Sequence, residues 1–224
     1  MTEPIIEFKD FSFKYNSQAE PTLKNINLKI NKEEKILLAG PSGSGKSTIG
    51  RCLNGLIPNI DQGEVEGKCL VNGKDITSTS LFDFSFTTST ILQDADSQFI
   101  GLTVGEDIAF ALENDCQPKD KMHQTVNQWA NELKIKELLT QSPQSLSGGQ
   151  KQIVALAGVL VDESPILLFD EPLANLDPAS GLKTMAIIDK IQKELNATVI
   201  IIEHRVEEVL SQPIDRIILV NEGT

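Results

Sequence analysis

The sequence predicts an α/β fold built on a parallel β-sheet, with an antiparallel β layer near its start and an α-helical segment inserted in its middle. The parallel sheet is indicated by short apolar runs that do not alternate with polar residues, as expected of strands covered by helices on both faces. The four runs are KILLAG (35–40), PILLFD (165–170), TVIIIE (198–203) and RIILV (216–220).

The antiparallel layer is predicted by alternation of apolar and polar residues in two early segments. Segments 11–15 and 26–30 both place apolar side chains at every second position, which is typical of half-buried strands. Asn72-Gly73 adds a dipeptide that favours a tight hairpin turn. We therefore expect a small antiparallel sheet ahead of the main parallel one.

Helical periodicity occupies the middle of the chain and recurs near its end. Thr103 and Glu106 have the spacing of a capping box, and Pro178 after Asp177 has the sequence of a helix start, with Leu182 expected on its apolar side. No internal repeat or long linker divides the chain. We expect a single domain, with a core formed by 1–93 and 156–224 and a helical subdomain formed by 94–155.

Composition limits the classes of function and the location. The chain has 224 residues, a net charge of −12 and three cysteines without a metal-binding spacing. Its longest uncharged apolar run, Ile153–Val161, is much shorter than the roughly 20 residues needed to cross a bilayer. The first residues lack the basic and apolar regions of a secretion signal. We expect a cytosolic protein that does not bind nucleic acid, because its overall charge opposes a phosphate backbone.

A phosphate-binding loop is predicted between the first apolar run and a helix. Its nine residues are Gly40, Pro41, Ser42, Gly43, Ser44, Gly45, Lys46, Ser47 and Thr48. The glycines allow backbone amides to converge on phosphates at a positive helix start, Lys46 is expected to reach the β- and γ-phosphates, and the Ser47 hydroxyl is expected to bind Mg²⁺. A glycine-rich turn with a surface lysine is the alternative.

Asp170 ends the second apolar run and Glu171 follows it, at the strand end where parallel sheets place their ligands. Asp170 is expected to hold Mg²⁺ through water, and Glu171 to polarise the water that attacks ATP. The alternative is a pair of solvated acids at a strand end. With the glycine-rich loop, these residues predict a P-loop NTPase core that uses ATP and Mg²⁺.

The segment LSGGQ, Leu146–Gln150, resembles the signature of the ABC ATPase family. The resemblance implies that Ser147, Gly148, Gly149 and Gln150 contact the γ-phosphate bound by a second ABC ATPase subunit or domain, in a head-to-tail pair, homo- or heterodimeric, with ATP between the two. The same residues also have the pattern of a capped helix start, and the two interpretations are compatible.

The resemblance assigns roles to four further residues. Gln93 would contact Mg²⁺ and act as a hinge toward a membrane partner, and His204 would contact the γ-phosphate and orient the attacking water. Asp177 would make a contact across the pair, and Tyr15 would stack on adenine. The alternatives are a polar strand end for Gln93, a helix-capping histidine for His204, a plain helix cap for Asp177 and a packing role for Tyr15.

Leu92–Asn114 resembles the energy-coupling-factor branch of the family, whose ATPases drive uptake of vitamins, vitamin precursors and metal ions. That branch implies a transmembrane coupling subunit, indirectly a membrane solute-binding subunit, and a peripheral position on the cytoplasmic face of the membrane. Phe99 and Ile100 are either interface residues or buried in the helical subdomain. Arg205 stands where the family often has an acid, and the EHR sequence resembles halves of fused tandem ATPases, so we expect one half of a longer chain.

Two other functions remain open from the sequence. One is a soluble ABC ATPase of translation or DNA maintenance, which the acidic balance opposes. The other is a nucleotide-binding half that closes without hydrolysis, which Glu171 and His204 oppose because both groups needed to handle the attacking water are present. We expect an ATPase whose hydrolysis is coupled to transport.

Overall fold

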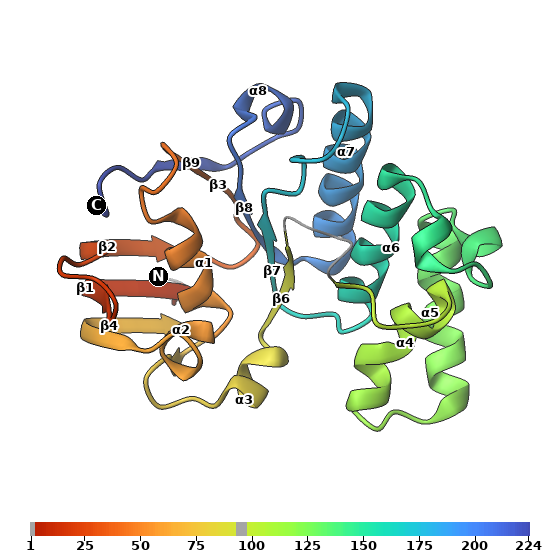
Figure 1. The fold of residues 1–224 in the computed structure, drawn as a ribbon, viewed down its shortest axis with the longest axis horizontal. Coiled ribbons are helices and arrows are strands. Elements are labelled where there is room, and N and C mark those ends of the chain that lie inside the picture. Colours follow the sequence, from red (N-terminus) through yellow and green to blue (C-terminus); the bar gives the residue numbers. More distant parts are fainter. Residues whose placement is uncertain (1–2, 93–97) are drawn as a thin grey trace.

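A computed structural model describes residues 3–92 and 98–224 of the chain. It contains one parallel and one antiparallel sheet, with a group of helices beside the parallel sheet (Figure 1). The α/β fold predicted from the sequence, with its parallel core and its early antiparallel layer, is confirmed.

The parallel sheet has five strands in the order β6-β7-β8-β3-β9. Four of them are the apolar runs identified in the sequence, and β6 is an addition, because TSTI is too short and polar to stand out as a buried strand. The strand bounds are β3 (Lys35–Ala39), β6 (Thr88–Ile91), β7 (Ile166–Asp170), β8 (Thr198–Ile202) and β9 (Arg216–Leu219).

The antiparallel sheet has the strand order β2-β1-β4-β5. Asn72 and Gly73 both have positive φ, 49° and 76°, so they form the expected tight turn between β4 and β5. Alternation along β1 places Phe11 and Phe13 in the interior, as predicted. The strand bounds are β1 (Ile6–Tyr15), β2 (Leu23–Ile30), β4 (Gly63–Val71) and β5 (Lys74–Asp75).

The helices begin where the capping signals predicted. Thr103 and Glu106 form a complete capping box, and the Asp177 carboxylate accepts hydrogen bonds at the start of α7. Leu182 is exposed, contrary to expectation, because the buried side of α7 follows Met185 and Ile188. The helix bounds are α1 (Lys46–Leu53), α2 (Leu56–Asn59), α3 (Leu81–Ser85), α4 (Val104–Asn114), α5 (Lys119–Glu132), α6 (Gly148–Leu160), α7 (Pro178–Leu195) and α8 (Val206–Val209).

The parallel sheet separates two hydrophobic cores. Ile36 and Leu38 of β3 belong to the core formed with α1 and the antiparallel sheet, whereas Leu37 and Ala39 belong to the core formed with α6 and α7. Successive side chains of a strand point to opposite faces of its sheet, so helices α1 and α6 cover opposite faces. Figure 1 shows this separation, with α1 and α6 on either side of the strands.

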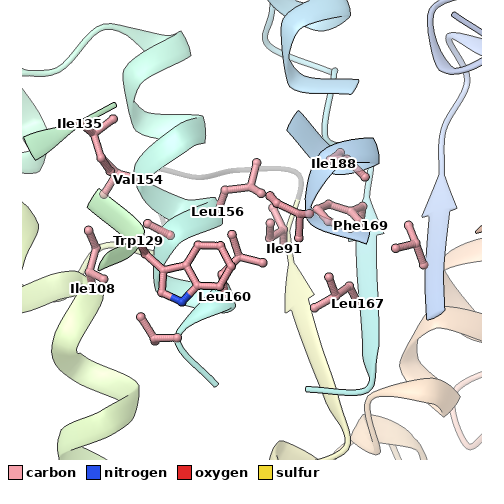
Figure 2. Close-up of a cluster of buried hydrophobic side chains, with 14 of the residues drawn as sticks. Ile91, Ile108, Trp129, Ile135, Val154, Leu156, Leu160, Leu167, Phe169 and Ile188 are labelled. Carbon is pink, nitrogen blue, oxygen red and sulfur yellow. The ribbon is translucent and has the colours of Figure 1, made fainter. Parts of the chain in front are cut away.

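The helical region shares its core with the parallel sheet. Figure 2 shows Ile108, Trp129 and Val154 from the helices in one cluster with Leu167 and Phe169 of β7. Helix α6 therefore packs on both the helices and the sheet, and it spans the expected boundary at 155, which stays a prediction. Within residues 3–92 and 98–224, none of the helices has the length and apolarity required to cross a bilayer.

Candidate functional site

The loop between β3 and α1 requires glycine at two positions. Gly40 has φ 153°, and a Cβ there would lie 2.1 Å from the Val220 carbonyl oxygen. Gly45 has φ 108°, and its Cβ would lie 2.9 Å from Leu23 Cδ2. Both backbone conformations and both close approaches exclude a side chain. The loop is thus wedged between β2 and the residues after β9, which fixes its amides in place.

Lys46 is the first residue of α1, and its side chain folds back over the loop. Its Nζ donates hydrogen bonds to the carbonyl oxygens of Gly40, at 2.9 Å, and Pro41, at 2.8 Å. Burial lowers the pKa of this amine, and the nearby charges of Glu171 and Asp170 oppose that effect. A cation is therefore held over the loop and close to both acids, as phosphate binding requires.

Asp170 ends β7 with a carboxylate that fits a cation. Its Oδ1 is buried and, within the described part of the chain, has no hydrogen-bond partner. Burial raises the pKa of this carboxyl, and the charge of Glu171 raises it further. A buried carboxylate oxygen that lacks a donor is costly unless a ligand satisfies it. Mg²⁺ would provide that partner, so the side chain present fits this ion.

The other Mg²⁺ ligands expected from the sequence are Ser47 and Gln93. Ser47 is exposed in the first turn of α1, and Gln93 lies outside the described residues. Among the residues that are described, no group of three His, Cys, Asp or Glu side chains is suited to hold a metal. A magnesium ion here would therefore depend on Asp170, Ser47 and the phosphates of a nucleotide.

Glu171 and His204 contact each other directly after their strands. Glu171 Oε1 lies 3.2 Å from His204 Nε2. The Glu171 backbone has φ 50°, and its amide donates to the Ile202 carbonyl at 2.8 Å. This backbone position, unusual for a residue with a side chain, turns the carboxylate toward His204 at the end of the sheet where the loop lies. The structure thus brings together the two residues expected to orient water.

Tyr15 lies beside the first turn of α1. Its hydroxyl is 3.3 Å from Thr48 Oγ1, and its ring meets Phe13 edge-on at a centroid distance of 4.7 Å. The aromatic ring is therefore positioned next to the loop, and its packing role exists alongside the predicted role in stacking on adenine.

The signature residues form the start of α6, away from this cluster. The Ser147 hydroxyl caps the helix through the Gln150 amide, and the Gln150 side chain accepts from the Ser147 amide at 2.9 Å. Around Gly148, a Cβ would have no described atom within 4 Å, so this helix start faces open space. Because α6 and α1 lie on opposite faces of the sheet, the chain does not bring its own signature to its own loop (Figure 1).

Asp177 lies on the signature side of the chain. Its carboxylate accepts from the Ser180 hydroxyl at 2.6 Å and from the amides of Ala179 and Ser180. The hydrogen bond from the Ser180 hydroxyl has the largest effect in lowering the pKa of Asp177, and the bonds from the amides lower it further. A Cβ on Gly149 would lie 3.8 Å from Ser180 Oγ, so Asp177 and the start of α6 present one exposed surface.

Glu203 is a site residue that the sequence analysis left without a role. Its side chain is only 2% exposed. The carboxylate accepts hydrogen bonds from the amides of Leu173, at 3.1 Å, His204, at 2.9 Å, and Arg205, at 3.2 Å. The signal for it was an acid at the end of the apolar run TVIII, since a buried acid needs several donors.

Three comparisons with known proteins bear on this arrangement. The profile of the ABC transporter family matches residues 23–174. Over 224 residues the chain is 99% identical to a Lactobacillus johnsonii protein that carries the provisional name ABC transporter ATP-binding protein, covering 100% of the chain and 39% of that protein. A Streptococcus mutans protein with the same provisional name is 62% identical, covering 99% of the chain and 40% of the relative.

A solved structure is similar over almost the whole chain. It is cbiO1 from Clostridium perfringens, described as part of the ABC transporter complex cbiONQ, with a TM-score of 0.88 and 30% identity. The alignment covers 99% of this chain and 86% of the solved one. The chain therefore belongs to the ABC transporter ATP-binding family. It spans about 40% of the length of the curated relatives it matches.

Proposed function

We propose that this chain binds ATP with Mg²⁺ and hydrolyses it in composite sites shared with a second ABC ATPase domain, and that hydrolysis energises a membrane importer of the energy-coupling-factor type. The observation that carries the enzymatic part is the 3.2 Å contact between Glu171 and His204, close to the amine of Lys46. A base and its orienting partner thus lie beside a phosphate-binding loop, as hydrolysis of a γ-phosphate needs.

The residues of this chain divide the chemistry as follows. Lys46 and the amides of the loop hold the β- and γ-phosphates, Ser47 and Asp170 hold Mg²⁺, and Tyr15 stacks on the adenine ring. Glu171 accepts a hydrogen bond from the attacking water and draws its proton away, while His204 keeps the carboxylate oriented. When bound, Mg²⁺ would neutralise charge on the phosphates. Gln93 is proposed as a further ligand of this ion.

The second half of each site comes from the paired domain. Ser147, Gly148, Gly149 and Gln150 present the exposed start of α6, and the positive end of a helix favours a phosphate. Asp177 makes its contact across the same interface. Coverage of about 40% of each curated relative supports the proposal that the chain is one part of a longer fused polypeptide, with room for a second such domain.

The membrane partner is supported by a groove whose lining includes Leu92 and Gln98. A cavity of about 370 Å³ is lined by Leu81, Leu92 and Asp162, and a neighbouring one shares Leu81 and Asp162 and adds Phe82. Phe82 is 68% exposed although it is a large apolar residue. An exposed apolar surface of this kind marks a protein contact, and a transmembrane coupling subunit is its proposed occupant.

The flanking segment adds to this surface unevenly. Ile100 is 64% exposed, which fits the interface role expected for it, whereas Phe99 packs partly against the core. Through the coupling subunit the chain would act on a membrane solute-binding subunit for a vitamin, a vitamin precursor or a metal ion. In this proposal the chain lies on the cytoplasmic face of the membrane and has no nucleic-acid partner.

Affinity purification of the full-length protein from detergent-solubilised membranes tests this function. We expect an integral coupling protein and a small membrane protein to copurify, and we expect the complex to hydrolyse ATP in a reaction that needs Mg²⁺. Recovery with ribosomes or DNA and without a membrane protein would contradict the transport role. Loss of detectable ATP turnover in the purified complex would contradict the enzymatic role.

A further inference from the structure

We propose that Arg205 is a positioning residue that holds the loop 171–177 in place relative to His204. It would thereby fix the positions of Glu171 and Asp177, the two ends of this loop. The inference rests on the proposed ATPase function and adds a residue to it. The loop 171–177 begins at Glu171, which is expected to polarise water, and ends at Asp177, which is expected to contact the paired domain.

The Arg205 guanidinium binds this loop through its backbone. Its Nη1 donates to the carbonyl oxygens of Leu173 and Leu176, the second at 2.8 Å. On the other side, Nε donates to Glu208 Oε1 at 2.8 Å and Nη2 contacts Glu208 Oε2, which makes a two-pronged ion pair. The guanidinium therefore bridges helix α8 and the loop, with a planar geometry that a lysine does not have.

Leu173 is held from two directions by Glu203 and Arg205, the two neighbours of His204 in the sequence. Its amide donates to the buried Glu203 carboxylate at 3.1 Å, and its carbonyl accepts from Arg205. Its side chain is fully buried, so the middle of the loop is anchored by packing as well. Since His204 lies between Glu203 and Arg205 in the sequence, a shift of the loop would alter the Glu171–His204 contact.

Helix α7 is shaped around the same ion pair. A Cβ at Gly181 would lie 2.5 Å from Glu208 Oε2 and 3.6 Å from Arg205 Nη2. Gly181 is in the first turn of α7, directly after the cap formed by Asp177. Because Gly181 has no side chain, the Arg205–Glu208 ion pair packs directly against the start of α7. This packing connects the helix cap at Asp177 to the residue that follows His204.

The experiment measures ATP turnover of the full-length complex for Arg205→Gln, with Arg216→Gln as the matched control. Arg216 also joins a backbone carbonyl, that of Lys29, to a carboxylate, that of Glu34, but it lies at the start of β9, away from the site. Glu171→Gln sets the largest loss that this site can contribute. A small displacement of reacting groups costs up to about 100-fold in rate, so we expect kcat to fall by about tenfold for Arg205→Gln.

The Michaelis constant separates positioning from general damage. Within the described part of the chain, the Arg205 side chain bonds to Leu173, Leu176 and Glu208 and not to the phosphate loop. We therefore expect the KM for ATP to change less than about twofold and Arg216→Gln to leave both constants unchanged. If Arg205→Gln retains the wild-type kcat while Glu171→Gln abolishes turnover, the inference about Arg205 is overturned and the proposed catalytic role of the site is not. Turnover that survives Glu171→Gln would instead overturn the proposed catalytic role of this site.

A second variant, Glu208→Gln, tests the proposal if the protein with Arg205→Gln does not fold. Glu208→Gln leaves the two loop carbonyls with their donor and weakens only the anchor of the guanidinium. We expect a smaller fall in kcat, about threefold, with an unchanged KM, because neutralising one partner weakens a charge-assisted bond without removing it. If Arg205→Gln unfolds, this variant decides: an unchanged kcat for Glu208→Gln would contradict the proposal.

Discussion

The phosphate loop and the signature helix are both glycine-containing helix starts, yet they are built in opposite ways. Gly40 and Gly45 have positive φ and are enclosed by Val220 and Leu23, and the amine of Lys46 is bonded inside the loop. Gly148 has open space around it, and the cap formed by Ser147 and Gln150 satisfies only the backbone of its own helix. One helix start is enclosed by its own chain, and the other is presented outward.

This difference teaches how the proposed catalytic site would be divided between two domains. Enclosure fixes amides at the positions that phosphates need before any ligand arrives. Exposure leaves the signature helix start available to a surface that the chain does not itself supply. Glycine at positions 40 and 45 is required by the backbone conformation, whereas glycine at position 148 would leave room for the proposed partner domain.

The largest effect is expected from Glu171→Gln. The amide keeps the shape and the contact with His204 but does not accept a proton, so ATP turnover should fall by about 100- to 10,000-fold. Nucleotide affinity should be retained, because Lys46 and the loop are unchanged. Measurement of single-site turnover and of ATP binding on the same preparation checks both, and a fall of less than about threefold would exclude Glu171 as the base.

Alanine substitutions at Gly40 and Gly148 compare the two helix starts directly. Gly40→Ala places Cβ 2.1 Å from the Val220 carbonyl oxygen, so we expect the free energy of unfolding to fall by about 3 kcal/mol. The Cβ added by Gly148→Ala has no described atom within 4 Å. This variant should raise the free energy of unfolding, by less than about 1 kcal/mol. Urea denaturation measures both, and equal losses would show that the two starts are enclosed alike.

A smaller effect, of opposite sign, is expected for Asp170→Asn. Burial raises the pKa of the Asp170 carboxyl, so its ionised form costs stability once the pH exceeds the ordinary value of 3.8. Without nucleotide, the variant should be more stable at pH 7, and the difference should vanish as the pH falls below the ordinary pKa.

Addition of ATP and Mg²⁺ should make the wild type more stable than Asp170→Asn, which reverses their order of stability. The wild type gains stability from binding, whereas the variant lacks the carboxylate that holds the ion. Thermal unfolding with and without both ligands measures the reversal. If the variant is less stable than the wild type without ligand, Asp170 is not a buried carboxylate that destabilises the fold until a cation binds.

The sequence predicted the parts of the site that depend on local pattern. The glycine-rich loop, the two acids at the end of β7 and the two capping boxes were recognisable because their residue types and spacings are set by backbone geometry alone. Strand β6 was missed, because its burial comes from neighbours distant in the sequence. The roles of Glu203 and Arg205 were also missed, since each is defined by contacts with Leu173, about 30 positions away.

The measurement that tests the divided site most directly is ATP turnover of Ser147→Arg, with Thr103→Arg as control. Both residues cap a helix through a complete capping box, so both variants lose about 1 kcal/mol of helix stability. We predict that only Ser147→Arg lowers turnover, by about 100-fold, while ATP affinity stays within about twofold. Unchanged turnover and unchanged ATP-driven pairing in Ser147→Arg would contradict the account.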